Sequence, residues 1–156
     1  MRHLLHPEAL DDMLLYVLWQ LQARAGGTVV RICESEFGIT RREWRLLAHL
    51  APHEGVLSSQ LAERTGLDRA RTSRALTTLA QKRLVQRTPR PGDRREVLIH
   101  LTDEGRALHA ALLPRVAAAN RALLDALSAD EVRVLDGLLQ RLQAQAERLA
   151  AAARDA

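Results

Sequence analysis

The side chains best suited to chemistry are the arginines in the middle of the chain. Residues 63–95 hold ten of the 23 Lys and Arg residues and only three acids, whereas the segments on either side are slightly acidic. The planar guanidinium of arginine matches the paired acceptors of phosphates and of guanine edges. This basic segment therefore predicts contact with a nucleic acid, the alternative being a solvated helix face.

The spacing of residues in this segment predicts a helix-turn-helix followed by a β-hairpin. Residues 57–66 form a short amphipathic helix, with Ser58 or Ser59 as its cap and Gly66 as its end. Asp68 caps a second helix that reaches about residue 83. Two short strands, 84–87 and 96–101, then flank a basic loop. The second helix can enter the major groove of DNA while the loop reaches the minor groove.

These elements define the candidate DNA-contacting side chains. Arginines of the second helix can reach guanine or phosphate, and its hydroxyl groups can bond to phosphates or bases. At the hairpin tip, Asp93 would orient an arginine by an ion pair. The predicted DNA-binding residues are Ser58, Arg69, Arg71, Thr72, Ser73, Arg74, Thr77, Arg90, Arg94 and Arg95.

Helical patterns surround this region. A long helix is predicted from Pro7 to about residue 36, weakened at Gly26 and Gly27. Thr40 and Glu43 form a capping box for the next helix. Thr102 caps a helix over about 103–126, which a proline at position 114 should kink or split. Ser128 and Glu131 open a last helix with a leucine stripe.

The terminal helices carry more apolar surface than one small winged helix can cover. The stripes lie within residues 7–36 and 103–150, and they predict association with a second copy of the chain. The alternative is that these helices pack only on their own DNA-binding part. We expect a single domain over residues 1–156, mainly α-helical with a small β-hairpin wing, in which residues 38–101 form the winged helix-turn-helix.

Several motifs resemble the MarR family of winged helix-turn-helix regulators. They are Gly38–Arg45, Leu61–Gly66, Asp68–Arg74, and Asp93-Arg94-Arg95 followed by Leu101-Thr102-Asp103-Glu104-Gly105. The resemblance implies a homodimer built from the terminal helices that binds a pseudo-palindromic operator, usually as a repressor released by a small molecule. The chain departs from the family pattern in two places. Arg83 stands where the family commonly has glycine. The wing reads Arg90-Pro91-Gly92-Asp93, where the family frequently has an acidic residue in the first place and an arginine in the third.

A site for a small effector is predicted near the junction of the dimerisation and DNA-binding parts, where the family places effectors. The few aromatic or polar residues on otherwise apolar helices would suit an aromatic carboxylate, although each taken singly fits a core or surface role. They are Tyr16, Trp19, Trp44, Arg45 and His49. Cys33, the single cysteine, is an alternative redox sensor, or else a small buried hydrophobe.

Other function classes find little support. The chain has no Gly-rich phosphate loop after a strand and no nucleophile elbow, so we expect neither an enzyme nor a cofactor. A single cysteine, with Pro52 breaking the helix between His49 and His53, argues against a metal site. Without a signal-like start or a long apolar run, we expect a cytoplasmic protein with no membrane contact. A non-specific architectural DNA-binding protein remains an alternative.

Overall fold

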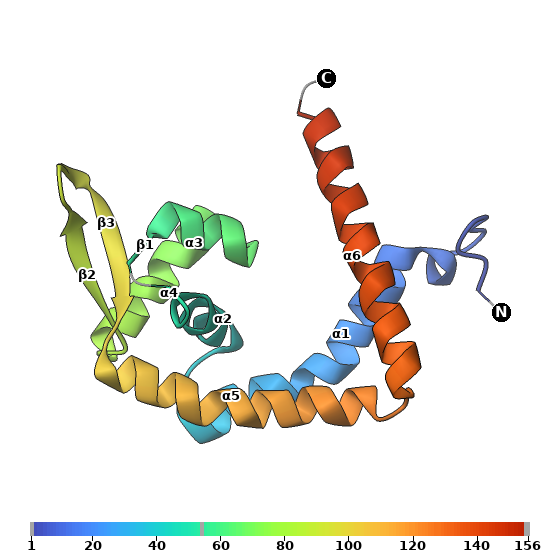
Figure 1. The fold of residues 1–156 in the computed structure, drawn as a ribbon, viewed down its shortest axis with the longest axis horizontal. Helices are drawn as coiled ribbons and strands as arrows, with labels where there is room; N and C mark the ends of the chain where they lie inside the picture. Colours follow the sequence, from blue (N-terminus) through green and yellow to red (C-terminus); the bar gives the residue numbers. More distant parts are fainter. Residues whose placement is uncertain (1, 54, 155–156) are drawn as a thin grey trace. The chain divides into compact units, whose positions relative to one another are not determined.

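The computed structural model describes residues 2–53 and 55–154, except for the side chains of Arg94 and Arg95. The chain divides into two compact units, residues 1–119 and residues 120–156. It is mainly helical with one small antiparallel sheet, which confirms the predicted fold class (Figure 1). The elements are α1 (Leu14–Arg31), α2 (Arg41–Leu50), β1 (Val56–Leu57), α3 (Ser58–Thr65), α4 (Arg69–Gln81), β2 (Val85–Arg90), β3 (Asp93–Leu101), α5 (Asp103–Leu124) and α6 (Ala129–Ala152).

The first helix begins later than predicted. The Asp12 carboxylate accepts hydrogen bonds from three backbone N–H groups, which also lower its pKa. These bonds hold residues 10–12 in a 3₁₀ turn, so α1 begins at Leu14 and not near Pro7. The three donors are His3 at 2.9 Å, Glu8 at 3.2 Å and Ala9 at 3.2 Å.

The two glycines of α1 do not end it. The helix passes through Gly26 and Gly27 and continues into a π-helical segment, Ile32–Glu36, as the predicted long helix requires. Gly26 is buried because the guanidinium of Arg41 lies against it. A Cβ atom at Gly26 would come within 2.9 Å of Arg41 Nη1.

The predicted capping box forms at the start of α2. The Thr40 hydroxyl accepts a hydrogen bond from the Glu43 N–H at 3.2 Å, and the Glu43 carboxylate accepts one from the Thr40 N–H at 2.7 Å. The first four backbone N–H groups of a helix have no partner within the helix, and without these two side-chain bonds two of them would need water as an acceptor. Local sequence therefore determines where α2 begins.

The helix-turn-helix forms as predicted, with one correction at its first cap. Gly66 ends α3 in the left-handed conformation at φ 64°, and Asp68 accepts a hydrogen bond from the Arg71 N–H at 2.8 Å to begin α4. The N-cap of α3, however, is Leu57. Its N–H donates to the Gln60 side chain at 3.3 Å, so neither Ser58 nor Ser59 serves as the cap.

The sheet is larger than predicted. It contains three antiparallel strands in the order β1-β3-β2, and β1 was not expected from the sequence because it is only two residues long. β2 and β3 extend through most of the predicted loop and leave only Pro91 and Gly92 as the turn. Gly92 has φ 86°, which suits the second central residue of a type II turn.

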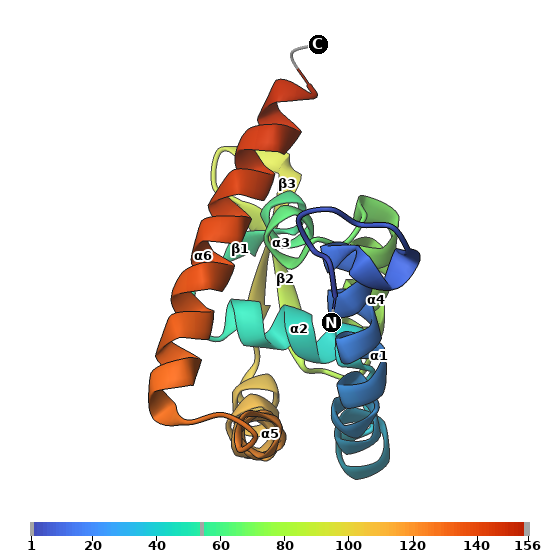
Figure 2. The ribbon, with the colours of Figure 1, turned by 90° about the vertical axis from the view of Figure 1, so that its right-hand side faces the viewer.

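The core of the first unit gathers α2, α3 and α4 against the sheet and the beginning of α5 (Figure 2). Burying each leucine side chain contributes about 1.5–3 kcal/mol relative to leaving it in water. The largest fully buried side chains include Leu46, Leu47, Leu50, Leu61, Leu76, Leu79, Ile99 and Leu112.

The chain turns sharply between α4 and β2. Arg83 adopts φ 58°, a left-handed conformation that favours glycine. Thr102 holds this turn, since its hydroxyl donates to the Arg83 carbonyl at 2.6 Å and its N–H donates to the Leu84 carbonyl at 3.2 Å. Gly105 allows this approach, because a Cβ atom there would lie 2.0 Å from the Leu84 oxygen. The Leu-Thr-x-x-Gly motif therefore joins the start of α5 to the end of α4.

The cap of α5 is confirmed, but of the two predicted effects of Pro114, a kink or a split, the split does not occur. The Thr102 hydroxyl accepts from the Gly105 N–H at 3.0 Å, and α5 then runs without interruption through Pro114. Proline removes only one N–H from the ladder, and Pro114 is exposed, so the remaining bonds of a 22-residue helix keep the two halves joined.

The second unit consists of the end of α5 and all of α6. Ser128 and Glu131 form the predicted capping box: the Ser128 N–H donates to the Glu131 carboxylate at 2.8 Å, and the Glu131 N–H donates to the Ser128 hydroxyl at 3.3 Å. Within the described ranges, no helix is both long enough and apolar enough to cross a lipid bilayer. The α6 helix leaves a row of apolar side chains 37–62% exposed, namely Val134, Leu135, Leu138, Leu142 and Leu149.

Candidate nucleic-acid interface

Helical geometry divides α4 into a buried and an exposed face. Leu76 and Leu79 are buried. Thr72 is buried with them, fully shielded from solvent, and its hydroxyl donates to the Asp68 carbonyl at 3.0 Å. The prediction that Thr72 contacts DNA does not fit this placement, because its side chain lies on the core side of the helix.

The remaining predicted side chains of α4 are exposed. Arg69, Ser73, Arg74 and Thr77 all reach solvent. Arg71 is also exposed and pairs with Asp68 at the helix start, with Nε 3.0 Å from the carboxylate. The structure therefore presents three arginines and two hydroxyl groups along the solvent side of one helix.

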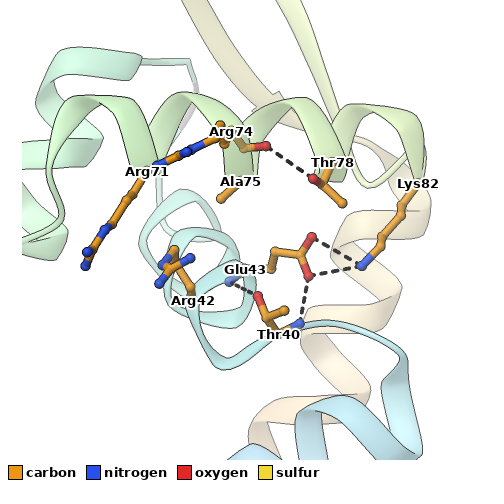
Figure 3. Close-up of a pocket in the computed structure, with 8 residues that line it drawn as sticks. All are labelled: Thr40, Arg42, Glu43, Arg71, Arg74, Ala75, Thr78 and Lys82. Carbon is orange, nitrogen blue, oxygen red and sulfur yellow. Dashed lines mark hydrogen bonds and ion pairs between the residues drawn. The ribbon is translucent and has the colours of Figure 1, made fainter.

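A groove lies between the inner edge of this exposed face and the beginning of α2 (Figure 3). It has a volume of about 450 Å³. On the α4 side, residues at helical spacing line it, with the small side chain of Ala75 at its floor. The lining residues are Thr40, Arg42, Glu43, Arg71, Arg74, Ala75, Thr78 and Lys82.

Among the described residues that line this groove, the single carboxylate already has a cationic partner. Glu43 is buried, and Lys82 Nζ lies 3.0 Å and 3.2 Å from its two oxygens. The same ammonium donates to the Gly38 carbonyl at 2.9 Å. Lys82 therefore acts as a structural link between α2 and the end of α4. Among the lining residues, Arg42 and Arg74 carry the positive charge that no described carboxylate pairs, whereas Arg71 pairs with Asp68.

The wing is tied to α4 by Arg87. Its guanidinium donates to the Thr77 hydroxyl at 3.0 Å, and that hydroxyl donates to the Ser73 carbonyl at 3.0 Å. Ser58, Ser73 and Arg87 also line a smaller groove of about 180 Å³ between α4 and the sheet. The predicted residues Ser58, Ser73 and Thr77 thus come together beside the wing.

At the wing tip, Arg90 forms an ion pair with Glu96 on the opposite strand. This hydrogen bond raises the pKa of the Arg90 guanidinium above its ordinary value. The side chains of Arg94 and Arg95 lie outside the described residues, so the predicted pairing of Asp93 with an arginine there stays a prediction.

The five predicted effector residues separate into two groups. On α1, Tyr16 stacks on Trp19 with ring centroids 5.5 Å apart. On α2, the buried Trp44 stacks on His109 of α5 at 5.3 Å. No hydrogen bond, ion pair or ring contact among the described residues joins the α1 group to the α2 group.

The two polar effector candidates have backbone contacts in the structure. Arg45 Nη1 donates to the Thr65 carbonyl at 3.3 Å, where α3 ends. His49 is half-buried, and its carbonyl accepts from the His53 ring at 3.0 Å. A carboxylate bound by Arg45 would compete with the end of α3, which carries the partial negative charge of a helix C-terminus.

Cys33 fits a structural role. It is fully buried, and burial raises the pKa of its thiol. The reactive form of cysteine is the thiolate, so a buried thiol with a raised pKa is a poor redox sensor.

Sequence reasoning missed three contributors to this surface. Arg42 was overlooked because it belongs to the α2 capping sequence and not to the helix-turn-helix, and Arg87 because it belongs to a strand. Gln81 is exposed and lies seven residues after Arg74, on the same face of α4. The helical spacing of 3.6 residues could have identified Gln81, but only the fold brings Arg42 and Arg87 beside α4.

Comparison with known proteins supports this arrangement. The family model of the MarR family matches residues 37–96. The chain is 30% identical to the HTH-type transcriptional regulator YdgJ of Bacillus subtilis over 129 residues, which cover 81% of this chain and 77% of YdgJ. It is 30% identical to the HTH-type transcriptional repressor NicR of Pseudomonas putida over 104 residues, 67% of this chain and 66% of NicR, just under two thirds of that repressor's length.

Solved structures share the fold over most of the chain. PcaV of Streptomyces coelicolor, solved in complex with its natural ligand, is 26% identical with a TM-score of 0.75, covering 90% of this chain and 99% of PcaV. CouR, a transcriptional repressor of Rhodococcus jostii RHA1, was solved bound to a 23-mer DNA duplex. That structure is 27% identical with a TM-score of 0.77 and covers 86% of this chain and 94% of CouR. The chain therefore belongs to the MarR family and is a DNA-binding transcriptional regulator with a winged helix.

Proposed function

We propose that this regulator is a homodimeric repressor that reads a pseudo-palindromic operator and is released by a small aromatic acid. The observation that carries the proposal is the exposed face of α4, where Arg69, Arg71 and Arg74 stand clear of the core beside the wing. A helix of this kind fits the major groove, and guanidinium groups bind guanine edges and phosphates.

Each part of the surface has a proposed role. Arg71 and Arg74 read bases or hold phosphates from the major groove, with Arg69 and Ser73 beside them. Ser58 and Thr77 bind the backbone where α3 and the wing meet α4. The wing places Arg90, Arg94 and Arg95 at the minor groove, where the potential is most negative, and Asp93 orients them.

Dimerisation is supported by the apolar side chains that each protomer leaves exposed. On α6 they form a row, and in the N-terminal segment they include Leu10, Leu15 and Trp19. We assign residues 7–36 and 103–150 to the dimer interface and residues 38–101 to DNA binding. Two α4 helices in such a dimer would need a separation of about 34–36 Å, one turn of B-DNA.

The proposed effector is an aromatic carboxylate held near Trp44 and Arg45, with Tyr16, Trp19 and His49 as further candidates. Solved relatives support a ligand in general: PcaV was crystallised with its natural ligand and CouR with p-coumaroyl-CoA. The ligand must favour the dimer that cannot bind DNA, and a coupling of about 1–3 kcal/mol would lower operator affinity about 5- to 150-fold.

The experiment that tests DNA reading is selection of duplexes from a random library, followed by affinity measurements at fixed salt. The wild type should enrich an inverted repeat. Arg71→Ala should then lose about 1–3 kcal/mol on that duplex, with relaxed preference at one position if Arg71 reads a base. Arg154→Ala, on an exposed arginine beyond α6 and outside the regions assigned to dimerisation and DNA binding, is the control. A wild type that enriches no sequence would be a non-specific architectural protein, and the proposal would fail.

The effector is tested by calorimetric titration with a panel of aromatic carboxylates. We expect one to bind the wild type, to lower its affinity for the selected duplex, and to bind Arg45→Ala more weakly than Arg45→Lys. If none binds, or if a binder leaves DNA affinity unchanged, the effector part of the proposal fails and the DNA-reading part stands.

A further inference from the structure

We infer that Arg42 of α2 is a phosphate-binding residue that extends the DNA contact beyond the helix-turn-helix and the wing. This rests on the proposed DNA-reading function of α4. The partner is the sugar–phosphate backbone of the duplex that α4 enters, at a phosphate next to the major groove.

The first support is convergence of charge from two elements. Arg42 reaches into the groove from the beginning of α2, while Arg71 and Arg74 line it from α4 (Figure 3). All three arginines are exposed. A hollow lined by charge of one sign concentrates its field on an ion of the opposite sign.

The second support is that some charged groups of the groove are already paired within the protein and others are not. Glu43, the carboxylate in the lining, is buried and engaged by Lys82 and by the Thr40 N–H. Among the described residues, neither Arg42 nor Arg74 has a carboxylate partner, whereas Arg71 has Asp68. The protein itself therefore leaves two guanidinium groups of the groove available to an external anion.

The third support is the shape of the site. Ala75 keeps the floor of the groove low, and Thr78 adds a hydroxyl beside it. The groove is open and about 450 Å³ in volume, which is large for one phosphate but suits a backbone segment that passes along its edge. The planar guanidinium of Arg42 can bind two phosphate oxygens at once.

The test is the salt dependence of DNA binding by Arg42→Ala on two probes of about 30 base pairs, the duplex selected by the wild type and a duplex of arbitrary sequence. Each phosphate contact contributes about 0.9 to the slope of log affinity against log salt. A dimer carries two copies of Arg42, so the slope should fall by about 1.8 on both probes. Between about 0.05 and 0.2 M salt the wild type should then lose about twelvefold more affinity than the variant.

Two matched variants separate the causes. Arg42→Lys keeps the charge and should keep the slope, and Arg154→Ala removes an exposed arginine that lies beyond α6, outside the regions assigned to dimerisation and DNA binding, and should change nothing. Because Arg42 is exposed, all three variants should unfold at the wild-type midpoint. A further measurement uses duplexes in which one phosphate at a time is replaced by a neutral methylphosphonate. At one position this replacement should lower the DNA affinity of the wild type and leave the affinity of Arg42→Ala unchanged.

A slope unchanged by Arg42→Ala overturns the inference, as does a change of base preference at one position with no change of slope. If Arg71→Ala weakens binding in the same series and Arg42→Ala does not, the proposed function stands and this inference alone fails. If the wild type selects no sequence, the proposed function fails, but the salt slope on the arbitrary duplex still shows whether Arg42 contacts phosphate.

Discussion

Lys82 at the end of α4 reaches across to the buried carboxylate of Glu43 in α2, with Nζ 3.0 Å from Oε2, although the two residues are 39 positions apart. Glu43 also caps its own helix through the Thr40 N–H. One carboxylate therefore determines both where α2 begins and where the end of α4 lies against it.

Replacing Lys82 with Met should destabilise the protein by about 2–3 kcal/mol. Breaking a fully buried pair costs about 3–5 kcal/mol, and the value is discounted here because the Lys82 side chain is 34% exposed. Urea unfolding at fixed protomer concentration measures the loss. The double variant with Glu43→Gln should lose less than the two single losses together, and additive losses would show that the pair does not interact.

Replacing Arg83 with Gly should stabilise the protein by about 0.5–1 kcal/mol. The backbone of Arg83 lies at φ 58°, where a Cβ atom is unfavourable, and its carbonyl bond to Thr102 does not need a side chain. Arg83→Ala is the matched control, because it removes the charge and keeps the Cβ atom. Equal thermal midpoints for the Gly and Ala variants would argue against strain at this turn.

Replacing Gly105 with Ala should destabilise the protein by about 2–3 kcal/mol. The new Cβ atom would lie 2.0 Å from the Leu84 oxygen, so the beginning of α5 must move away from the turn after α4. Gly27→Ala, in a helix with nothing within 4 Å, should instead gain up to about 1 kcal/mol. Chemical denaturation of both variants checks this, and a wild-type midpoint for Gly105→Ala would contradict the close approach.

His109 should make the protein less stable as the solution is acidified. Burial lowers the pKa of His109 below its ordinary value of 6.5, so between the two values the unfolded chain binds more protons than the folded one. The contribution of His109 to stability is thus intact above pH 6.5 and decreases as the pH falls towards the folded pKa.

The measurement is the free energy of unfolding between about pH 7.5 and 5 for the wild type and His109→Phe. The phenyl ring can keep the stacking on Trp44 without a proton to bind, so the variant should retain stability at neutral pH and lose part of the acid dependence. If the wild type and His109→Phe lose stability identically as the pH falls, His109 does not cause the acid dependence.

A charged residue in the apolar row of α6 should prevent dimerisation. Leu138 and Leu142 are 47% and 44% exposed in the protomer, so Leu138→Glu with Leu142→Glu should leave the fold intact while burying charge in the proposed interface. Sedimentation should give about 17.4 kDa for this variant and about twice that for the wild type. Gln140→Lys is the control, because residue 140 lies on the opposite side of the helix from Leu138 and Leu142, and a lysine there can still pair with Asp136. A dimeric double variant would place the interface elsewhere.

The sequence by itself determined the features that depend on neighbours within a few residues. The capping boxes at Thr40 and Ser128, the Asp68 cap and the Gly66 stop each require only a side chain and a backbone group within one helical turn. For the same reason the helix-turn-helix and the basic character of α4 could be predicted without knowledge of the fold.

Only the tertiary structure decided which side chains of this surface face outwards and which elements meet. The hydroxyl of Thr72 looks equivalent to that of Ser73 in sequence, but the packing of α4 on the core buries Thr72 and exposes Ser73. Arg42 lies beside Arg71 and Arg74 because α2 packs across α4, a contact between segments about 30 residues apart. Such contacts depend on how whole helices pack, so they cannot be predicted from the sequence pattern of any one segment.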